Sequence, residues 1–395
     1  MKKTFPVYLI FLSMGMIDAV GPMVSLAKES FNISITMATL LPLLGYLMYG
    51  LLSIPIGVLQ DKKGKIFIIN LGLTCAFLGL AIPILSGMYG SMVIQSGSLA
   101  QFYKILAAIL LLGAGGSILQ VAGNPFIRDI SEPGHYSKNL SLAQSFITIG
   151  SSLGFLLPVF ALYAFGFDWS ILFPVYLSIV LISFLWLKFA KTTENRQVKE
   201  HHASLKSCIN LLKNPYVFAM VFGVFVYCGV EISMSTHIPI LLKMKYGVSV
   251  EDKGLLISWS LFYLPILAGR FFGSFIMSLI VPKRLLLITG IVALIGTLMI
   301  FSNSYTLTLI GIFFVGLGFA NIFPLIFSIT IERMPEYTNE LSGLMVSSIV
   351  GGAFIPPIMG MVADGISIST AFIVPLICIS YLIFIAIINN RKTQD

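Results

Sequence analysis

Long apolar stretches dominate this sequence and limit what the chain can fold into. An α-helix of about 20 apolar residues crosses the hydrocarbon core of a bilayer, and each backbone amide there needs a partner within its own segment. The runs are continuous rather than alternating, which excludes the strands of a membrane barrel. The predicted spans cover twelve ranges: 5–27, 35–59, 66–86, 101–129, 139–166, 170–190, 215–243, 253–281, 285–302, 306–331, 341–364 and 368–389.

The charge content supports the same conclusion. Only 10% of the 395 residues are charged, whereas a soluble domain carries roughly 25%. So few charges cannot cover the surface of soluble domains of this total length. We therefore predict an all-α integral membrane protein of twelve transmembrane helices embedded in the lipid bilayer.

The positions of lysine and arginine predict the orientation. With the N-terminus inside, eighteen of the 24 basic residues fall on the cytoplasmic side, five fall outside, and Arg270 lies within a span. This excess predicts a multi-pass protein of the cell inner (plasma) membrane with both termini in the cytoplasm. Basic loops facing anionic lipid also account for the net charge of +8, so no nucleic-acid partner is expected.

The two halves of the chain resemble each other. Pro158 in span five and Pro357 in span eleven are 199 positions apart, and so are Pro125 in span four and Pro324 in span ten. The long polar segment 191–213 separates these halves. We predict a six-helix bundle over 1–190, a cytoplasmic linker over 191–213 and a second, pseudo-symmetric six-helix bundle over 214–395. Internal repeats of this kind are typical of secondary transporters.

Polar residues concentrate on every third predicted span. Asp18 lies in span one and Glu231 in span seven, while spans four and ten contribute Gln120, Asn124 and Asn321 near their middles. Polar groups at bilayer depth are costly and usually functional. The pattern predicts a central cavity lined by spans one, four, seven and ten.

Asp18 and Glu231 are the candidate ionisable groups of this cavity. Asp18 lies about 20 Å along its helix, where the apolar layer favours a neutral carboxyl group, so a proton site is one interpretation. The alternative is a structural carboxyl group bonded to Ser13 or to a neighbouring helix. Glu231 could bind substrate hydroxyls, take a proton, or join two helices through Arg270 on span eight.

Neutral amides suit a hydroxylated substrate because they both donate and accept hydrogen bonds. Gln120 and Asn124 lie one helical turn apart and share a face, and Gln144 and Asn321 add further amides. Trp259 could provide a flat apolar surface for a sugar ring. Asp61, in the basic loop after span two, is interpreted as either a solvated charge or part of a gate.

The sequence has no motif of an enzyme. HExxH, GxSxG and paired histidines are missing from the spans, and there is no GxxxxGK[ST] loop for ATP hydrolysis. We therefore predict a non-enzymatic protein without cofactor or metal, driven by an ion gradient. The cysteines have no metal-binding spacing and are interpreted as buried free thiols.

Several motifs resemble those of a known family. Gly57-x-x-x-Asp61-x-x-Gly64-Lys65 resembles the signature loop of the major facilitator superfamily. The segments 119–127, 140–154, 227–238 and 349–364 are similar to the fucose–galactose–glucose:proton symporter family. The resemblance implies the major facilitator fold, alternating access and proton-driven uptake of a hexose or related monosaccharide by a chain that works as a monomer.

The residues also depart from the family pattern. Gln120 stands where fucose carriers have an acidic residue and is more similar to the glucose/galactose branch. Ile147 and Phe319 replace expected amides, with Asn321 displaced by two positions. Sodium-coupled sugar uptake and proton-coupled efflux of a drug or metabolite therefore stay as alternatives. The predicted substrate contacts are Gln120, Asn124, Gln144, Glu231, Asn321 and Trp259, the proton-coupling groups Asp18 and Glu231, and the gating or structural charges Asp61 and Arg270.

Overall fold

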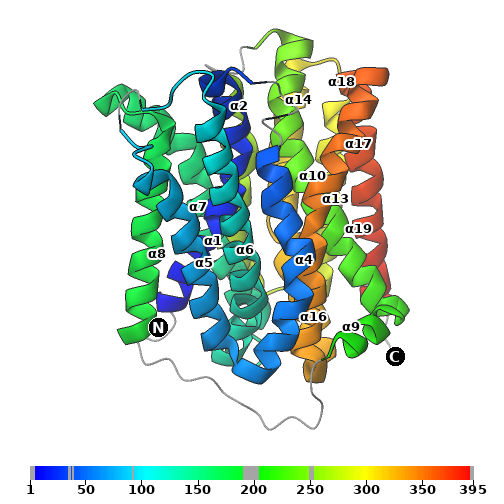
Figure 1. Cartoon of the computed structure of the whole chain (residues 1–395). Helices are drawn as coiled ribbons and strands as arrows, with labels where there is room; N and C mark the ends of the chain where they lie inside the picture. Colours follow the sequence, from blue (N-terminus) through cyan, green and yellow to red (C-terminus); the bar gives the residue numbers. More distant parts are fainter. Residues whose placement is uncertain are drawn as a thin grey trace. The chain divides into compact units, whose positions relative to one another are not determined.

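The computed structural model describes residues 5–33, 37, 40–90, 93–189, 204–248 and 253–391 (Figure 1). In these ranges the chain is mostly helical, and twelve helical segments are long and apolar enough to cross a membrane. They begin with Val7–Val24 and end with Ile368–Asn390, close to the first and last predicted spans. The prediction of an all-α, multi-pass membrane protein is confirmed.

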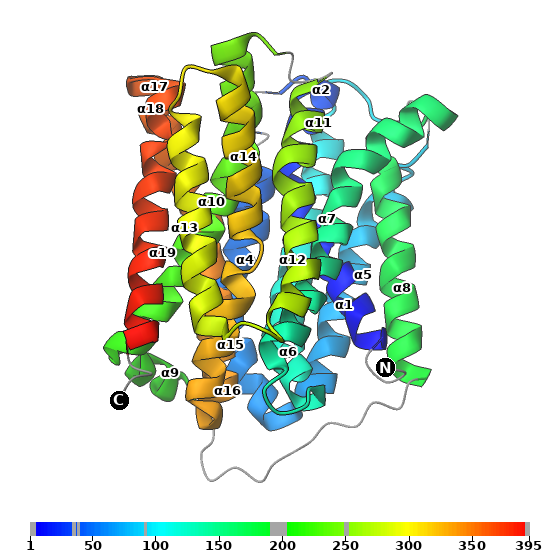
Figure 2. The same ribbon diagram turned by 180° about the vertical axis from the view of Figure 1, so that it is seen from behind.

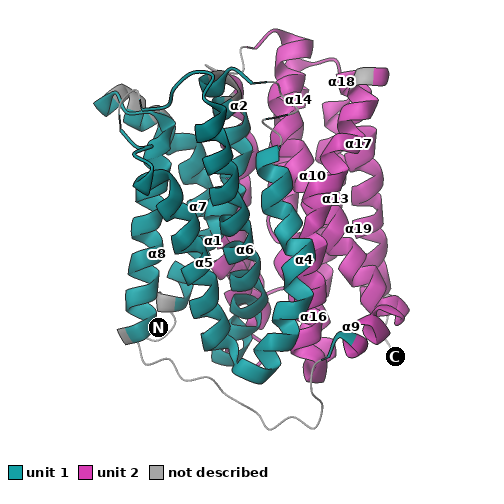
Figure 3. Cartoon of the chain, in the orientation of Figure 1, with its two compact units in different colours: residues 1–130, 146–205 teal, residues 131–145, 206–395 magenta. Residues whose placement is uncertain are grey.

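The chain forms two compact units, coloured separately in Figure 3. Unit 1 comprises residues 1–130 and 146–205, and unit 2 comprises residues 131–145 and 206–395. The difference from the predicted bundles lies in α7 (Tyr136–Phe165), a continuous helix whose first ten residues group with unit 2. Span five is thus shared between the units.

Unit 1 is built around α6, which contacts α1, α4 and α5, while α8 packs on α1 and α5. Gly64 has a φ of +89°, which lets the chain turn sharply between α4 and α5. This is the glycine of the loop motif found in the sequence. Besides α7, the elements are α1 (Phe5–Asp18), α2 (Val20–Phe31), α4 (Leu40–Lys63), α5 (Lys65–Leu85), α6 (Leu99–Ile130), η1 (Trp169–Ile171) and α8 (Leu172–Phe189).

In unit 2, the central helix α10 contacts α15, α17 and α19, and α14 packs on α12 and α13 (Figure 2). The elements are α9 (Leu205–Leu212), α10 (Pro215–Tyr246), α11 (Leu255–Ser258), η3 (Trp259–Tyr263), α12 (Leu264–Ile276), α13 (Pro282–Ile300), α14 (Tyr305–Phe319), α15 (Ile322–Arg333), η4 (Pro335–Tyr337), α16 (Thr338–Ser347), η5 (Ser348–Val350), α17 (Gly351–Gly365), α18 (Ile368–Ala371) and α19 (Ile373–Arg391).

Several spans are interrupted near polar candidates. Span one breaks between α1 and α2 after Asp18, and span ten breaks between α14 and α15 at Asn321. Span eight contains a π-helical turn that begins at Trp259. A break inside the membrane frees backbone groups that must find other partners, and such breaks frequently occur at binding sites.

The predicted linker 191–213 lies outside the described residues up to position 203; the described part begins at 204 and contains α9. Cys208 of this short helix is buried, and burial, followed by the nearby Glu340 carboxylate, raises the pKa of its thiol to about 11. A thiol with that pKa is neutral at physiological pH. The four cysteines are free, as the sequence predicted, but only Cys208 and Cys228 are also buried, whereas Cys75 and Cys378 are partly exposed at the surface of the helices.

Candidate functional site

Asp18 of unit 1 is surrounded by neutral hydroxyl donors. Tyr46 Oη on α4 donates to one carboxylate oxygen at 3.1 Å, and Ser151 Oγ on α7 donates to the other at 3.3 Å. The hydroxyl of Ser13 instead contacts Ser183 Oγ at 2.9 Å. The structural alternative for Asp18 therefore uses a tyrosine and a serine from other helices, not Ser13.

The amides of α6 lie inside the same unit. Gln120 is 6% exposed and Asn124 is fully buried one turn later. Among the described residues, the Gln120 Oε1 atom has no hydrogen-bond partner although it is buried. A buried acceptor without a donor costs free energy, so this oxygen is suited to a donor from a bound molecule or water.

Glu231 of unit 2 has a cationic partner. Arg270 on α12 is 5% exposed, and its Nη2 donates to Glu231 Oε1 at 3.4 Å and to Tyr227 Oη at 3.1 Å. The Tyr227 ring stacks on Phe319, with the ring centroids 5.3 Å apart. The glutamate–arginine pair considered from the sequence is present, and Arg270 also bonds the hydroxyl of this stacked tyrosine.

Two predicted substrate contacts lie beside Arg270. The side chain of Asn321 is 4% exposed; its Nδ2 donates to the Gly269 carbonyl oxygen at 2.7 Å, and its Oδ1 accepts from Ser141 Oγ at 2.5 Å. The backbone carbonyl oxygen of Gln144, not its side-chain amide, accepts from Arg270 Nη1 at 3.4 Å. Both functional groups of Asn321 are thus engaged by protein atoms.

Trp259 lies on η3 of unit 2 and Asp61 on α4 of unit 1. Trp259 begins the π-helical turn of span eight, and its buried indole Nε1 has no hydrogen-bond partner among the described residues. Asp61 is half-buried in the last turn of α4. In the adjoining turn, Lys65 forms an ion pair with Asp129, with 2.5 Å between Nζ and Oδ2.

The two acids occupy equivalent positions in their units. A Cβ atom added at Gly150 would collide with the Leu12 carbonyl oxygen, and one added at Gly351 would collide with the Phe225 carbonyl oxygen. Asp18 follows Leu12 by six residues, and Glu231 follows Phe225 by six residues. In each unit, then, the acid lies six residues beyond a point where two spans approach backbone to backbone.

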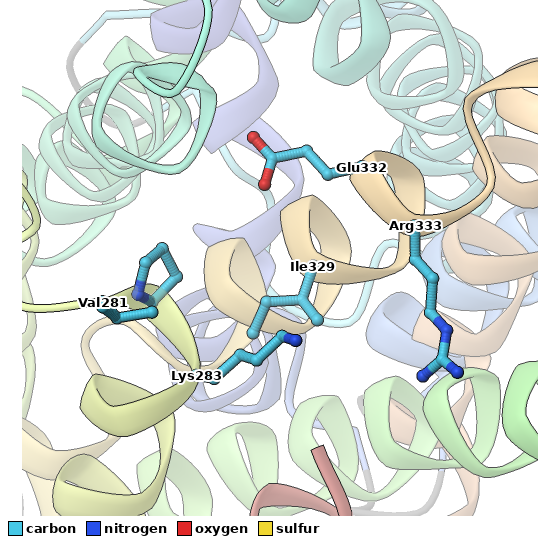
Figure 4. A pocket seen from close by; sticks show the side chains of 6 residues that line it. Val281, Lys283, Ile329, Glu332 and Arg333 are labelled. Carbon is cyan, nitrogen blue, oxygen red and sulfur yellow. The ribbon is translucent and has the colours of Figure 1, made fainter. Parts of the chain in front are cut away.

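A separate pocket of about 430 Å³ lies where α13 begins and α15 ends; Figure 4 shows the side chains that line it. Glu332 is eleven residues beyond Asn321, about 16 Å along a helix, so the pocket is distinct from the Glu231 cluster. The guanidinium of Arg333 lies over the Tyr216 ring, 4.1 Å from its centroid. The pocket is lined by Val281, Pro282, Lys283, Ile329, Glu332 and Arg333.

Comparison with known proteins places the chain in a family. The model of the Major Facilitator Superfamily matches residues 7–357. The chain belongs to the Major Facilitator Superfamily. A glucose/galactose transporter of Brucella abortus biovar 1 (strain 9-941) is 26% identical over 396 residues, covering 97% of this chain and 93% of the relative. An L-fucose-proton symporter of Escherichia coli (strain K12) is 21% identical, covering 93% and 88% of the two chains.

A solved structure shares the fold of this Major Facilitator chain. The crystal structure of the transporter FucP in the outward conformation matches with a TM-score of 0.78 and 20% sequence identity, covering 98% of this chain and 99% of FucP. At this identity the match supports the fold alone. It confirms the twelve-helix facilitator architecture that the sequence motifs implied.

Sequence reasoning missed four residues that organise the candidate site. Tyr46 and Ser151 bind Asp18, while Tyr227 and Ser141 bind the Arg270–Asn321 cluster. Hydroxyl groups are frequent in membrane helices, so their presence alone carries little signal. The useful signal was position: Tyr46 and Ser151 belong to the span-two and span-five segments that recur in the second half.

Proposed function

We propose that the protein is a secondary active transporter that imports a hexose or related monosaccharide by proton symport with alternating access. Membership of the family and the names of the sugar-transporting relatives support this proposal. The observation that carries it is the pair of equivalent acids, Asp18 and Glu231, with partners of different chemistry. Asp18 accepts hydrogen bonds from two hydroxyl groups, whereas the charge of Glu231 is balanced by Arg270.

Asp18 is the proposed proton site. In the described hydrogen bonds its partners Tyr46 and Ser151 are neutral hydroxyls, and neither depends on the negative charge of the carboxylate. Neutralising Glu231, in contrast, would leave the guanidinium of Arg270 buried without a balancing charge, which is costly. We therefore assign the travelling proton mainly to Asp18 and hydroxyl binding mainly to Glu231.

The remaining sugar contacts would come from groups that have bonding capacity left over. The buried Gln120 Oε1 can accept from a sugar hydroxyl, and the Trp259 Nε1–H can donate to one. Asn124 extends the amide face of α6 by one turn. Asn321, whose amide is already used by Gly269 and Ser141, is better suited to supporting the site than to contacting sugar.

The setting of this activity is also proposed. The asymmetry of lysine and arginine supports an inner (plasma) membrane location with both termini in the cytoplasm, and the chain would work as a monomer. The coupling ion is a proton in this proposal, because neutral hydroxyl donors around a carboxylate suit a titrating group. Sodium is the competing ion that the experiment must exclude.

Uptake by purified protein in proteoliposomes tests the proposal. With an inward proton gradient, labelled glucose, galactose or fucose should accumulate above its external concentration, and a protonophore should abolish the excess. Accumulation that follows an imposed sodium gradient would show that sodium, and not the proton, is the coupling ion. Extrusion of hydrophobic cations without any sugar uptake would show that the protein exports such compounds and does not import sugar.

Binding can be measured separately by thermal unfolding, because a ligand stabilises the native state by mass action. The transported sugar should raise Tm, and Gln120→Ala should remove that rise. Gln101→Ala is the matched control on the same helix, since the described bonds of the Gln101 side chain go to backbone atoms of Val93 and Gln95. Loss of the rise in the control variant would show that the effect is not specific to the site.

A further inference from the structure

The break in span ten creates an acceptor that Arg270 uses. Pro324 has no backbone N–H, so the Ala320 carbonyl oxygen four residues earlier has no helical donor. Arg270 Nε donates to this oxygen at 3.0 Å. The Nε atom is therefore anchored where α14 ends and α15 begins, while Nη2 of the same group faces Glu231.

Asn321 ties the same break to α12. Its Nδ2 donates to the Gly269 carbonyl oxygen, the residue just before Arg270. A Cβ atom added at Gly273 would collide with the Asn321 amide, so α12 and the break fit together only because position 273 lacks a side chain. Arg270 and Asn321 thus form one rigid polar cluster between α12 and α15.

The first segment of α7 is held by this cluster. The single hydroxyl proton of Ser141 is shared between the Arg270 carbonyl oxygen at 2.8 Å and Asn321 Oδ1 at 2.5 Å. The Gln144 carbonyl oxygen accepts from Arg270, and Ser137 Oγ contacts Ser328 Oγ at 2.7 Å. Positions 137, 141 and 144 share one helix face, and all three are buried.

We propose that Ser141, Arg270 and Asn321 form a polar latch that holds residues 136–145 of α7 on α12 and α15, and that the charge of Glu231 sets its strength through Arg270. The guanidinium serves Glu231, the Ala320 carbonyl and the Gln144 carbonyl at once. When a substrate hydroxyl draws the Glu231 carboxylate away from Nη2, the guanidinium turns about its Nε bond to Ala320, and its Nη1 contact with α7 weakens. This inference rests on the proposed function in assigning substrate binding to Glu231.

The latch joins the substrate site to a helix shared by both units. Residues 131–145 belong to unit 2, whereas α7 from Phe146 onward belongs to unit 1. Because α7 is one continuous helix, contacts that hold its first ten residues also restrict the movement of the residues that follow. Arg270 and Asn321 act in this scheme as positioning residues, because neither needs to touch the sugar.

The strength of the latch can be measured by how fast a buried cysteine in α7 reacts. The test protein is the full chain with its four native cysteines changed to alanine and with Ala143→Cys, at a fully buried position in the segment 136–145. In proteoliposomes, the rate of labelling by a small maleimide is compared between variants. Ser141→Ala removes one buried hydrogen bond and should raise the rate about fivefold, while Ser141→Thr should restore it.

Ser145→Ala is the matched control. Ser145 lies one turn later on the same face, is equally buried, and donates to its own helix at the Ser141 carbonyl oxygen. Its replacement should leave the labelling rate unchanged. Gly273→Ala, which displaces the Asn321 amide, should raise the rate as Ser141→Ala does and provides an independent route to the same result.

Glu231→Gln tests the link to the substrate site. It should also raise the labelling rate, and combined with Ser141→Ala it should give less than the product of the two separate effects. Equal rates for Ser141→Ala and Ser145→Ala, or an unchanged rate for Glu231→Gln, would overturn the latch.

Sugar-dependent Tm on the same samples keeps the two proposals apart. If sugar raises Tm but the labelling pattern is absent, the latch is wrong and sugar binding stands. If the labelling pattern is present but no sugar raises Tm, the latch stands and the proposed substrate is wrong.

Discussion

Asp18 in unit 1 and Glu231 in unit 2 sit six residues beyond matching backbone contacts, yet their surroundings differ in charge. Asp18 accepts hydrogen bonds from Tyr46 and Ser151, whereas Glu231 faces the guanidinium of Arg270. The backbone of span one and span seven is therefore repeated, while the chemistry of the partner helices is not.

The difference separates two tasks that a symporter must perform. A carboxylate among hydroxyl groups can gain and lose a proton without creating an isolated buried charge. A carboxylate paired with a buried guanidinium pays a large cost for the same change. A repeat that began with two similar sites could thus assign proton coupling to one unit and substrate recognition to the other.

The largest expected effect is that of Asp18→Asn. An amide cannot carry the proton, so sugar accumulation should fall to passive equilibration while sugar exchange between the two sides continues. Uptake and exchange assays in the same proteoliposomes measure both quantities. Uphill accumulation that survives in this variant would remove Asp18 from coupling and erase the contrast between the two acids.

The Glu231–Arg270 pair should show strong coupling in a double-mutant cycle. Glu231→Gln or Arg270→Gln alone leaves a buried charge without its partner and should cost about 3–5 kcal/mol of stability. The double variant should cost less than the sum of the two single effects. Thermal unfolding gives the three values, and strict additivity would show that the pair does not act as a unit.

The two glycine contacts should respond alike. Gly150→Ala and Gly351→Ala each force a methyl group against a backbone carbonyl, which should destabilise the protein by about 1–3 kcal/mol. Gly21→Ala is the control, because a Cβ atom there meets no other atom within 4 Å. If only one of the two contact variants is destabilised, the acids are not held at equivalent positions by the same device.

The smallest effect belongs to the hydroxyl donors of Asp18. Tyr46→Phe removes one hydrogen bond at 3.1 Å and should lower stability by about 1 kcal/mol, with a matching modest loss of uptake rate. The exposed tyrosine in Tyr103→Phe serves as the control. A loss as large as that of Asp18→Asn would mean that Tyr46 does more than orient the carboxylate.

Much of the architecture could be predicted without coordinates. Continuous apolar runs require helices in a bilayer, so twelve spans followed directly from the sequence, and the repeated Pro125–Pro324 and Pro158–Pro357 spacing indicated the duplicated halves. Buried polar side chains such as Asp18 and Gln120 were also recognisable, because any polar group in an apolar run is costly. These features depend only on residues that are close in the sequence, so they can be recognised without knowing which helices pack together.

The partners of those side chains could not be predicted. Tyr46 reaches Asp18, and Arg270 reaches the Ala320 carbonyl, only because of how each helix is rotated and which helices are neighbours. Asn321 was predicted as a substrate contact from its type and depth, but the break at Pro324 and the approach of α12 engage its amide with Gly269 and Ser141. The sequence determined which polar groups enter the membrane; only tertiary packing decided which of them meet, because contacts between helices separated by a hundred residues depend on the geometry of the whole bundle.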